Sequence, residues 1–309
     1  MNYTLHQLQV FLKIAKTRSI TKAAEELHLT QPAVSIQFKN FQEQFEIPLV
    51  EIIGRQLHVT DFGLEIAEAA ENIINEVQAI NYKSSAFKGH LTGKLRISVV
   101  STGKYIMPYF LSDFLKENKD VQLDMDVTNR SLVIESLEKN QVDFSLLSLD
   151  PERLKTNNLP LLENKLHLVA SPSIHSEDEL LSRSVFNDLP LIHREKGSGT
   201  RLVMERFLQQ NNLPFKTKLE LKSNEAVKQA VIAGLGYSIM PLIGIKNELQ
   251  NGQLKVVNVK GFPLTSTWNL VWLSQKKFSP VANKFLEFMT EHKDKIIRNK
   301  FQWFEDFRP

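Results

Sequence analysis

The spacing of apolar residues over the first sixty positions constrains the fold of this chain more than any other feature of the sequence. Apolar residues recur at helical intervals in three short segments, and the last of these begins after Thr30, a good N-terminal cap. Two β-prone runs, Val50–Ile53 and Gln56–Val59, follow and predict a hairpin. Three helices and a hairpin in this order predict a winged helix-turn-helix domain.

The third predicted helix carries residues suited to a DNA groove. A polar outer face is expected of any amphipathic helix, but Ile36 is an apolar residue in the middle of that face, where it would contact a thymine methyl group. Gln31 and Ser35 would reach base edges there, and Lys39 would meet a phosphate. Arg55 at the hairpin tip suits a narrow minor groove, with a solvated arginine as the alternative. The candidate DNA contacts are Thr30, Gln31, Pro32, Ser35, Ile36, Lys39 and Arg55.

The charge distribution points away from a nucleic-acid partner. The chain has 38 Lys and Arg against 35 Asp and Glu, a net charge of +3. Residues 276–309 hold eight basic and five acidic residues, which accounts for the whole excess, whereas residues 1–65 hold six basic and seven acidic residues. If the N-terminal domain binds DNA, it must do so with few phosphate contacts, and we expect a shallow dependence of affinity on salt.

The segment 61–81 has the apolar period of a coiled coil. Ile66, Ala70, Ile73, Val77 and Ile80 are spaced by alternating steps of four and three residues. A period of 3.5 residues predicts that this helix pairs with a second copy of the chain. The alternative is a helix that covers the core of its own domain.

After Gly93 the pattern changes to alternating strands and helices, which predicts an α/β domain with mainly parallel sheets and enough residues for two lobes. Its expected strands include Leu166–Ala170, Leu254–Val259 and Asn269–Leu273. We therefore expect four parts: a winged helix-turn-helix over 1–60, a dimerisation helix and hinge over 61–92, a two-lobed α/β domain over 93–296 and a C-terminal extension over 297–309.

One loop of the α/β domain has the composition of an anion site. Gly197-Ser198-Gly199-Thr200 precedes a predicted helix, whose first backbone N–H groups are free to bind an anion. A capping loop without a ligand is the alternative. Hydroxyl and amide side chains at strand ends converge on the crevice of such a sheet, and Arg194 would add a charge-assisted bond to a carboxylate or phosphate.

Residues 5–63 resemble the DNA-binding domain of LysR-type transcriptional regulators. The resemblance rests on motifs in matching order: Leu5-x-x-Leu8-x-x-Phe11, Ser19-Ile20-Thr21-x-Ala23-Ala24-x-x-Leu27, Thr30-Gln31-Pro32-Ala33-Val34-Ser35, Ile47-Pro48-Leu49, and Gly54-Arg55 before Leu57-x-Val59-Thr60. The chain departs from the family pattern at Ile36, where the family often has a basic residue, and at Glu46, Val50 and Ile52.

The resemblance extends over residues 90–295, which look like the family's effector domain with two lobes similar to those of periplasmic binding proteins. It is strongest toward regulators of Calvin-cycle operons. It implies a homodimer that assembles into a homotetramer, a double-stranded DNA operator, contact with RNA polymerase, and a small anionic metabolite that reorients the lobes. The residues that it places around the cleft, with Arg194 added, are Ser101, Thr102, Thr128, Ser148, Arg194, Gly197, Ser198, Gly199, Thr200 and Asn224.

The sequence gives no support to a catalytic function. It contains no cysteine, and its eight histidines form no pair at metal-ligand spacing, so we expect no catalytic residue, no metal site and no cofactor other than the effector. A secretory signal and a membrane span are not expected either, which predicts a cytoplasmic protein. The rival hypothesis is a cytosolic solute-binding protein or enzyme that uses the two-lobed domain.

The C-terminal residues combine aromatic and basic side chains. Phe301, Trp303, Phe304 and Phe307 lie in the extension beyond the resemblance. Such residues either dock on a neighbouring subunit or cover their own domain. Binding of nucleic acid by this segment is a weaker third hypothesis.

Overall fold

The computed structural model describes residues 2–54, 56–86, 91–176, 179–214 and 217–308. The chain forms two compact units, Met1–Gly89 and His90–Pro309. Arg55, the predicted contact at the hairpin tip, lies outside the described residues. No helix among the described residues has the length and apolar character needed to cross a membrane.

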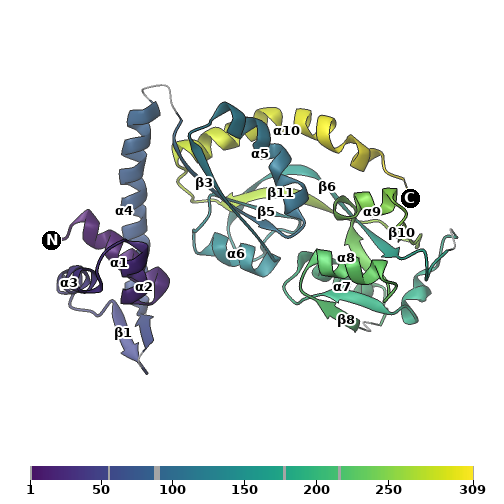
Figure 1. The fold of residues 1–309 in the computed structure, drawn as a ribbon, viewed down its shortest axis with the longest axis horizontal. Helices are drawn as coiled ribbons and strands as arrows, with labels where there is room; N and C mark the ends of the chain where they lie inside the picture. Colours follow the sequence, from purple (N-terminus) through teal and green to yellow (C-terminus); the bar gives the residue numbers. More distant parts are fainter. Residues whose placement is uncertain (1, 55, 87–90, 177–178, 215–216, 309) are drawn as a thin grey trace. The chain divides into compact units, whose positions relative to one another are not determined.

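The first unit contains the predicted helices and hairpin (Figure 1). Its elements are α1 (Leu5–Thr17), α2 (Ile20–Glu26), α3 (Gln31–Gln42), β1 (Val50–Ile53), β2 (Gln56–Val59) and α4 (Asp61–Ala86). Each of the three short helices begins at a hydroxyl cap: Thr4, Ser19 and Thr30 accept hydrogen bonds from backbone N–H groups of the first helical turn. The winged helix-turn-helix is therefore specified locally, by caps and apolar spacing.

The apolar residues of α4 that were predicted to pair with a second chain lie in two different environments. Ile66 and Ala70 pack against α1 in the core of the first unit, and Ala70 is only 1% exposed. Ile73 and Ile80 are 41% and 65% exposed, and Val77 is half-buried. Ile66 and Ala70 thus cover the core of their own domain, whereas the exposed Ile73 and Ile80 are accessible to another chain.

The second unit is built around one seven-stranded sheet and one two-stranded sheet. Its strands are β3 (Gly93–Val100), β4 (Val121–Thr128), β5 (Phe144–Leu147), β6 (Thr156–Ala170), β7 (Leu191–Arg194), β8 (Thr217–Leu221), β9 (Ser238–Pro241), β10 (Lys255–Val256) and β11 (Leu264–Leu273). Its α-helices are α5 (Met107–Glu117), α6 (Arg130–Glu138), α7 (Gly199–Gln210), α8 (Asn224–Ile232), α9 (Lys246–Gln250) and α10 (Pro280–Asp306).

Two long strands join the lobes of this unit. The first lobe contains β3–β5 with α5 and α6, and the second contains β7–β9 with α7 and α8 (Figure 1). Strands β6 and β11 pair over residues 156–166 and 264–273, and their side chains contribute to the apolar cores of both lobes. The cleft between the lobes therefore has these two strands as its floor.

The prediction of mainly parallel sheets was wrong. Strand β3 pairs in parallel with β4 and β5, and β7 with β8, but every pairing of β6 and β11 is antiparallel. Only the C-terminal ends of β6 and β11 were expected as strands, because the first half of β6 is polar and contains Pro160. The expected strand Leu254–Val259 is reduced to Lys255–Val256.

The C-terminal extension continues helix α10 and covers its own domain. Phe301 and Phe304 are each 1% exposed, and the ring of Phe301 packs against Tyr109 and Phe110 of α5. The ammonium group of Lys165 on β6 donates hydrogen bonds to the carbonyl groups of residues 304 and 305, 3.3 and 3.2 Å away. Of the two main alternatives for this segment, packing within the chain is the one that the structure shows.

Candidate functional site

The outer face of α3 exposes both polar and apolar side chains. Gln31 and Pro32 are exposed, Ser35 is half-buried, and Ile36 is 58% exposed. The Lys39 ammonium group lies 3.8 Å from the Glu43 carboxylate on the same helix. This exposed pair neutralises part of the only positive charge on α3, which leaves polar and apolar groups as the main features of the face.

The first unit exposes further apolar side chains on its hairpin. Ile52 and Ile53 on β1 are 76% and 59% exposed. Gln42 at the end of α3 turns toward the start of the hairpin. Its side-chain oxygen accepts from the backbone N–H of Leu49 at 2.7 Å, and its amide group donates to the carbonyl of Ile47 at 3.2 Å. Gln42 thus positions the hairpin relative to α3.

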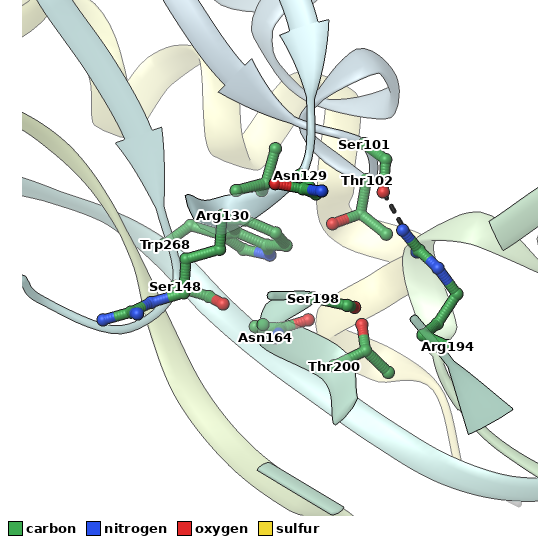
Figure 2. Close-up of a pocket in the computed structure, with 12 residues that line it drawn as sticks. Ser101, Thr102, Asn129, Arg130, Ser148, Asn164, Arg194, Ser198, Thr200 and Trp268 are labelled. Atoms are coloured by element: carbon green, nitrogen blue, oxygen red, sulfur yellow. Dashed lines mark hydrogen bonds between the residues drawn. The ribbon is translucent and has the colours of Figure 1, made fainter. Parts of the chain in front are cut away.

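The second unit encloses a cavity between its lobes, where polar side chains from both lobes point toward a common space (Figure 2). The cavity holds about 10 Å³, room for one water molecule, so a larger ligand requires the lobes to part. Its lining residues are Val100, Ser101, Thr102, Asn129, Arg130, Ser148, Asn164, Arg194, Ser198, Gly199, Thr200 and Trp268. Seven of the ten residues predicted for the cleft are among them.

Arg194 connects the two lobes. Its guanidinium group donates to the hydroxyl of Ser101 at 3.1 Å (Figure 2). It also donates to the side-chain oxygen of Asn224, whose amide nitrogen donates to Ser101 at 2.9 Å. On its other edge it forms two hydrogen bonds with the carboxylate of Glu195, at 2.8 and 2.9 Å. Glu195 neutralises the charge of the buried Arg194. This arginine therefore serves mainly to hydrogen-bond one lobe to the other, and less as the positive charge that the sequence predicted would bind the ligand.

Two helices begin at the cavity from opposite lobes. Asn129 caps α6 through its side-chain oxygen, and Ser198 precedes α7 without making a side-chain capping bond. The first-turn N–H groups of α7 have no acceptor within the helix, and the dipoles of both helices place partial positive charge at the cavity. This arrangement favours an anion.

A glycine permits the close approach of these helix starts. Gly197 has a φ of +90°, and an added Cβ would lie 2.6 Å from the Ser131 hydroxyl. The backbone N–H of Ser131 donates to the carbonyl of Gly197 at 3.2 Å, which links the lobes a second time. Gly197 therefore borders the cavity rather than lining it. Thr128 at the end of β4 and Asn224 at the start of α8 also lie outside the lining.

Five lining residues were not predicted from the sequence: Val100, Asn129, Arg130, Asn164 and Trp268. Asn129 directly follows β4, and an amide side chain at a strand end is a signal that the sequence analysis used for the cleft, so Asn129 was accessible to the same reasoning. Asn164 and Trp268 lie within the floor strands and carried no such signal. Burial and the neighbouring Arg206 lower the pKa of Arg130, and the smaller effects of Glu152 and Asp150 oppose this shift.

Two protein-family models cover nearly the whole chain. Residues 5–64 match the bacterial regulatory helix-turn-helix protein, lysR family, and residues 88–294 match the LysR substrate binding domain.

Among the described residues no cluster of three or more His, Asp or Glu side chains is positioned to hold a metal ion.

Individual proteins with the same organisation are also similar over their full length. The chain is 39% identical to the HTH-type transcriptional activator CmpR of Synechocystis sp., over 96% of this chain and 97% of the relative. It is 36% identical to the RuBisCO operon transcriptional regulator of Acidithiobacillus ferrooxidans, over 93% of each chain.

A solved structure resembles the second unit. It is the regulatory domain of Synechocystis PCC6803 CcmR in complex with 2-PG, which is 29% identical with a TM-score of 0.62 and covers 65% of this chain and 98% of that one. The relatives confirm the resemblance to regulators of Calvin-cycle operons, and they are regulators rather than enzymes. The chain belongs to the LysR family of DNA-binding transcriptional regulators, whose activity is modulated by a small molecule bound to the two-lobed domain.

Proposed function

We propose that this regulator senses a small phosphorylated carboxylic acid in the cleft between its lobes. The observation that carries the proposal is the convergence of the starts of α6 and α7 on one cavity whose lining contains arginines and no carboxylate among the described residues. The related CcmR domain binds 2-PG, that is 2-phosphoglycolate, which has this chemistry. The residues proposed to surround the ligand are Ser101, Thr102, Ser148, Arg194, Ser198, Gly199 and Thr200 in the lining, with Thr128, Gly197 and Asn224 supporting them.

The first unit is proposed to read its operator with α3. Gln31 and Ser35 contact base edges, Ile36 a thymine methyl group, and Lys39 a phosphate, with Thr30 and Pro32 setting the start of the helix. The exposure of Gln31 and Ile36 supports this assignment. Since the target is DNA, we place the protein in the bacterial cytoplasm.

The assembly is proposed to be a homodimer that pairs through α4 and associates further into a homotetramer. The exposed Ile73 and Ile80 support pairing through the second half of α4. Binding of the anion parts the lobes and so alters the spacing of the DNA-binding units, the bend of the operator and contact with RNA polymerase. The ligand achieves this because it favours one assembly state over the other.

The test is a footprinting titration of the full-length protein on its upstream intergenic DNA, with and without 2-phosphoglycolate. We expect 2-phosphoglycolate to change the protected region or its hypersensitive sites. Gln31→Ala and Ser35→Ala should remove the footprint without changing thermal unfolding, and Gln44→Ala, an exposed position just beyond α3, is the matched control. A footprint that is unaffected by 2-phosphoglycolate argues against the proposed effector class, and unchanged footprints in the α3 variants argue against the helix assignment.

A further inference from the structure

The floor of the cleft contains polar atoms that the chain leaves without a partner. Trp268 on β11 and Asn164 on β6 are 1% and 3% exposed, and both line the cavity. Among the described residues, no hydrogen-bond partner exists for the indole Nε1–H of Trp268, the Oδ1 of Asn164 or the Nε–H of Arg130. Buried polar atoms are nearly always paired, so the unpaired indole N–H of Trp268, which faces the cavity, points to a bound acceptor. The Oδ1 of Asn164 is itself an acceptor and would pair only with a donor.

These atoms form a second set of contacts, distinct from the start of α7. The N–H groups of Gly199 and Thr200 come from the second lobe and are suited to a phosphate. The indole N–H of Trp268 comes from a floor strand, and Figure 2 shows it beside the aliphatic part of Arg130, across the cavity from Arg194. A ligand that reaches both sets needs an acceptor group at each end.

The second acceptor is more favourable when it is negatively charged. Trp268 offers an N–H, and no carboxylate side chain lines the cavity among the described residues. The guanidinium group of Arg130 is directed away from the other lining side chains (Figure 2) and donates to the carbonyl of Asp150 at 3.0 Å. Hydrogen bonds to a charged acceptor are stronger than those to a neutral one. The side-chain amide of Asn164 already donates to the Ser266 hydroxyl at 3.1 Å, which fixes its position on the floor.

We propose that the cleft floor is a subsite for the carboxylate of a two-headed ligand, and that Trp268 is its specificity-determining residue. The proposal rests on the proposed function, because it assumes that a phosphate occupies the start of α7. The ligand class is a short acid with a phosphate at one end and a carboxylate at the other. Single-headed anions such as inorganic phosphate use the α7 contacts alone.

The location of this subsite links ligand identity to lobe movement. Trp268 pairs with Leu162 in the antiparallel ladder that joins the lobes, and the ladder shifts register between Trp268 and Asn269. A ligand that contacts only α7 touches the second lobe. A ligand that also contacts Trp268 touches the strands that pass between the lobes, so a two-headed ligand acts on the lobe arrangement in a way that phosphate does not.

The experiment measures the preference of the full-length protein for 2-phosphoglycolate over inorganic phosphate by calorimetry. We expect a preference of at least tenfold in the native chain. Trp268→Phe keeps an aromatic ring and removes the N–H, and it should reduce the preference about tenfold by weakening only 2-phosphoglycolate binding. Trp272→Phe on the same strand is the matched control, because its ring packs against Phe144 and Phe278 away from the cavity lining.

A second measurement keeps the native Trp268 and so does not depend on folding of the Trp268→Phe variant. The chain has three tryptophans, so Trp272→Phe combined with Trp303→Phe leaves Trp268 as the sole emitter. Its emission should shift with 2-phosphoglycolate and not with phosphate.

The possible outcomes separate this inference from the proposed function. Three outcomes overturn the floor subsite and leave the anion site in place. Trp268→Phe loses affinity equally for both probes, it loses affinity for neither, or the Trp268 emission does not change when 2-phosphoglycolate binds. Native protein that binds neither probe overturns the proposed effector class, and the subsite with it.

Discussion

The guanidinium group of Arg194 lies 3.1 Å from the hydroxyl of Ser101 and so ties β7 of the second lobe to the end of β3 in the first. Arg194 is 4% exposed, and its side-chain partner Glu195 is 12% exposed. A buried ion pair contributes little net stability in itself, but removal of one partner leaves the other charge uncompensated. The tie therefore matters both for the stability of the second unit and for the resting arrangement of the lobes.

Replacement of Arg194 by Met should destabilise the second unit by about 3 kcal/mol, because the Glu195 carboxylate and the side chain of Asn224 lose their partner. Denaturant unfolding of the full-length chain measures this. Arg206→Met is the control, since Arg206 and Glu152 form an ion pair with side chains 46% and 77% exposed, for which we expect a change below about 1 kcal/mol. Equal effects of the two substitutions would contradict the role of Arg194.

The parts of the fold that local sequence specifies were predicted, and those that depend on distant pairing were not. Thr30 predicted the start of α3, and its hydroxyl accepts from the N–H of Ala33. The glycines at 197 and 199 marked the start of α7 in the same way. The first half of β6 escaped notice because polar residues and Pro160 hide its alternation, and it becomes a strand only by pairing with β11.

The same distinction explains which site residues were found. Ser101 and Ser198 lie at a strand end and a helix start, where a single segment of sequence reveals a functional position. The polar atoms of Asn164 and Trp268 meet only because two strands a hundred residues apart pair, and a tryptophan on a strand is otherwise indistinguishable from a core residue. The pairing of Arg194 with Glu195 also depends on the turn after β7, which sequence alone does not specify.

Operator binding should depend weakly on salt. The first 65 residues contain six basic and seven acidic residues, and the positive charge of Lys39 is partly compensated by Glu43. We expect affinity to fall by no more than about fifty-fold between 50 and 200 mM salt, which corresponds to roughly three phosphate contacts. Ile36→Lys should steepen this dependence and raise affinity for unrelated DNA. Fluorescence anisotropy over a salt series measures both, and a steep slope in the native protein would count against the prediction.

The stability of the second unit should fall at mildly acidic pH because of His167. Burial, with a smaller effect of Lys165, lowers the pKa of His167 to about 4, against about 6.5 in an unfolded chain. Between these values the unfolded chain binds a proton that the folded chain does not, so the free energy of unfolding decreases as pH falls from about 6.5 to 4, by roughly 3 kcal/mol in total. Above pH 6.5 this contribution is fully present.

His167→Gln should remove that component of the pH dependence. The measurement is the difference between the native and variant unfolding free energies across pH 4–7, which cancels the contribution of the carboxyl groups. His292→Gln is the control, because the His292 side chain is 43% exposed on α10. Parallel curves for the native protein and His167→Gln would show that His167 does not carry the effect.

The C-terminal extension should be required for stability rather than for assembly. Phe301 is 1% exposed and packs between α5 and the rest of the core, with ring centroids 5.4 and 5.8 Å from Tyr109 and Phe110. Phe301→Ala should destabilise the second unit by about 3–5 kcal/mol, because the cavity that it leaves is bounded by rigid rings. Lys300→Ala, one position earlier on the exposed side of α10, is the control. Deletion of residues 298–309 should lower the midpoint of thermal unfolding at unchanged oligomer mass. The contrary outcome is a truncated chain that keeps its unfolding midpoint but forms a smaller oligomer in light scattering. That result would assign the aromatic residues to a contact between subunits, because removing a segment that packs on its own domain would destabilise that domain.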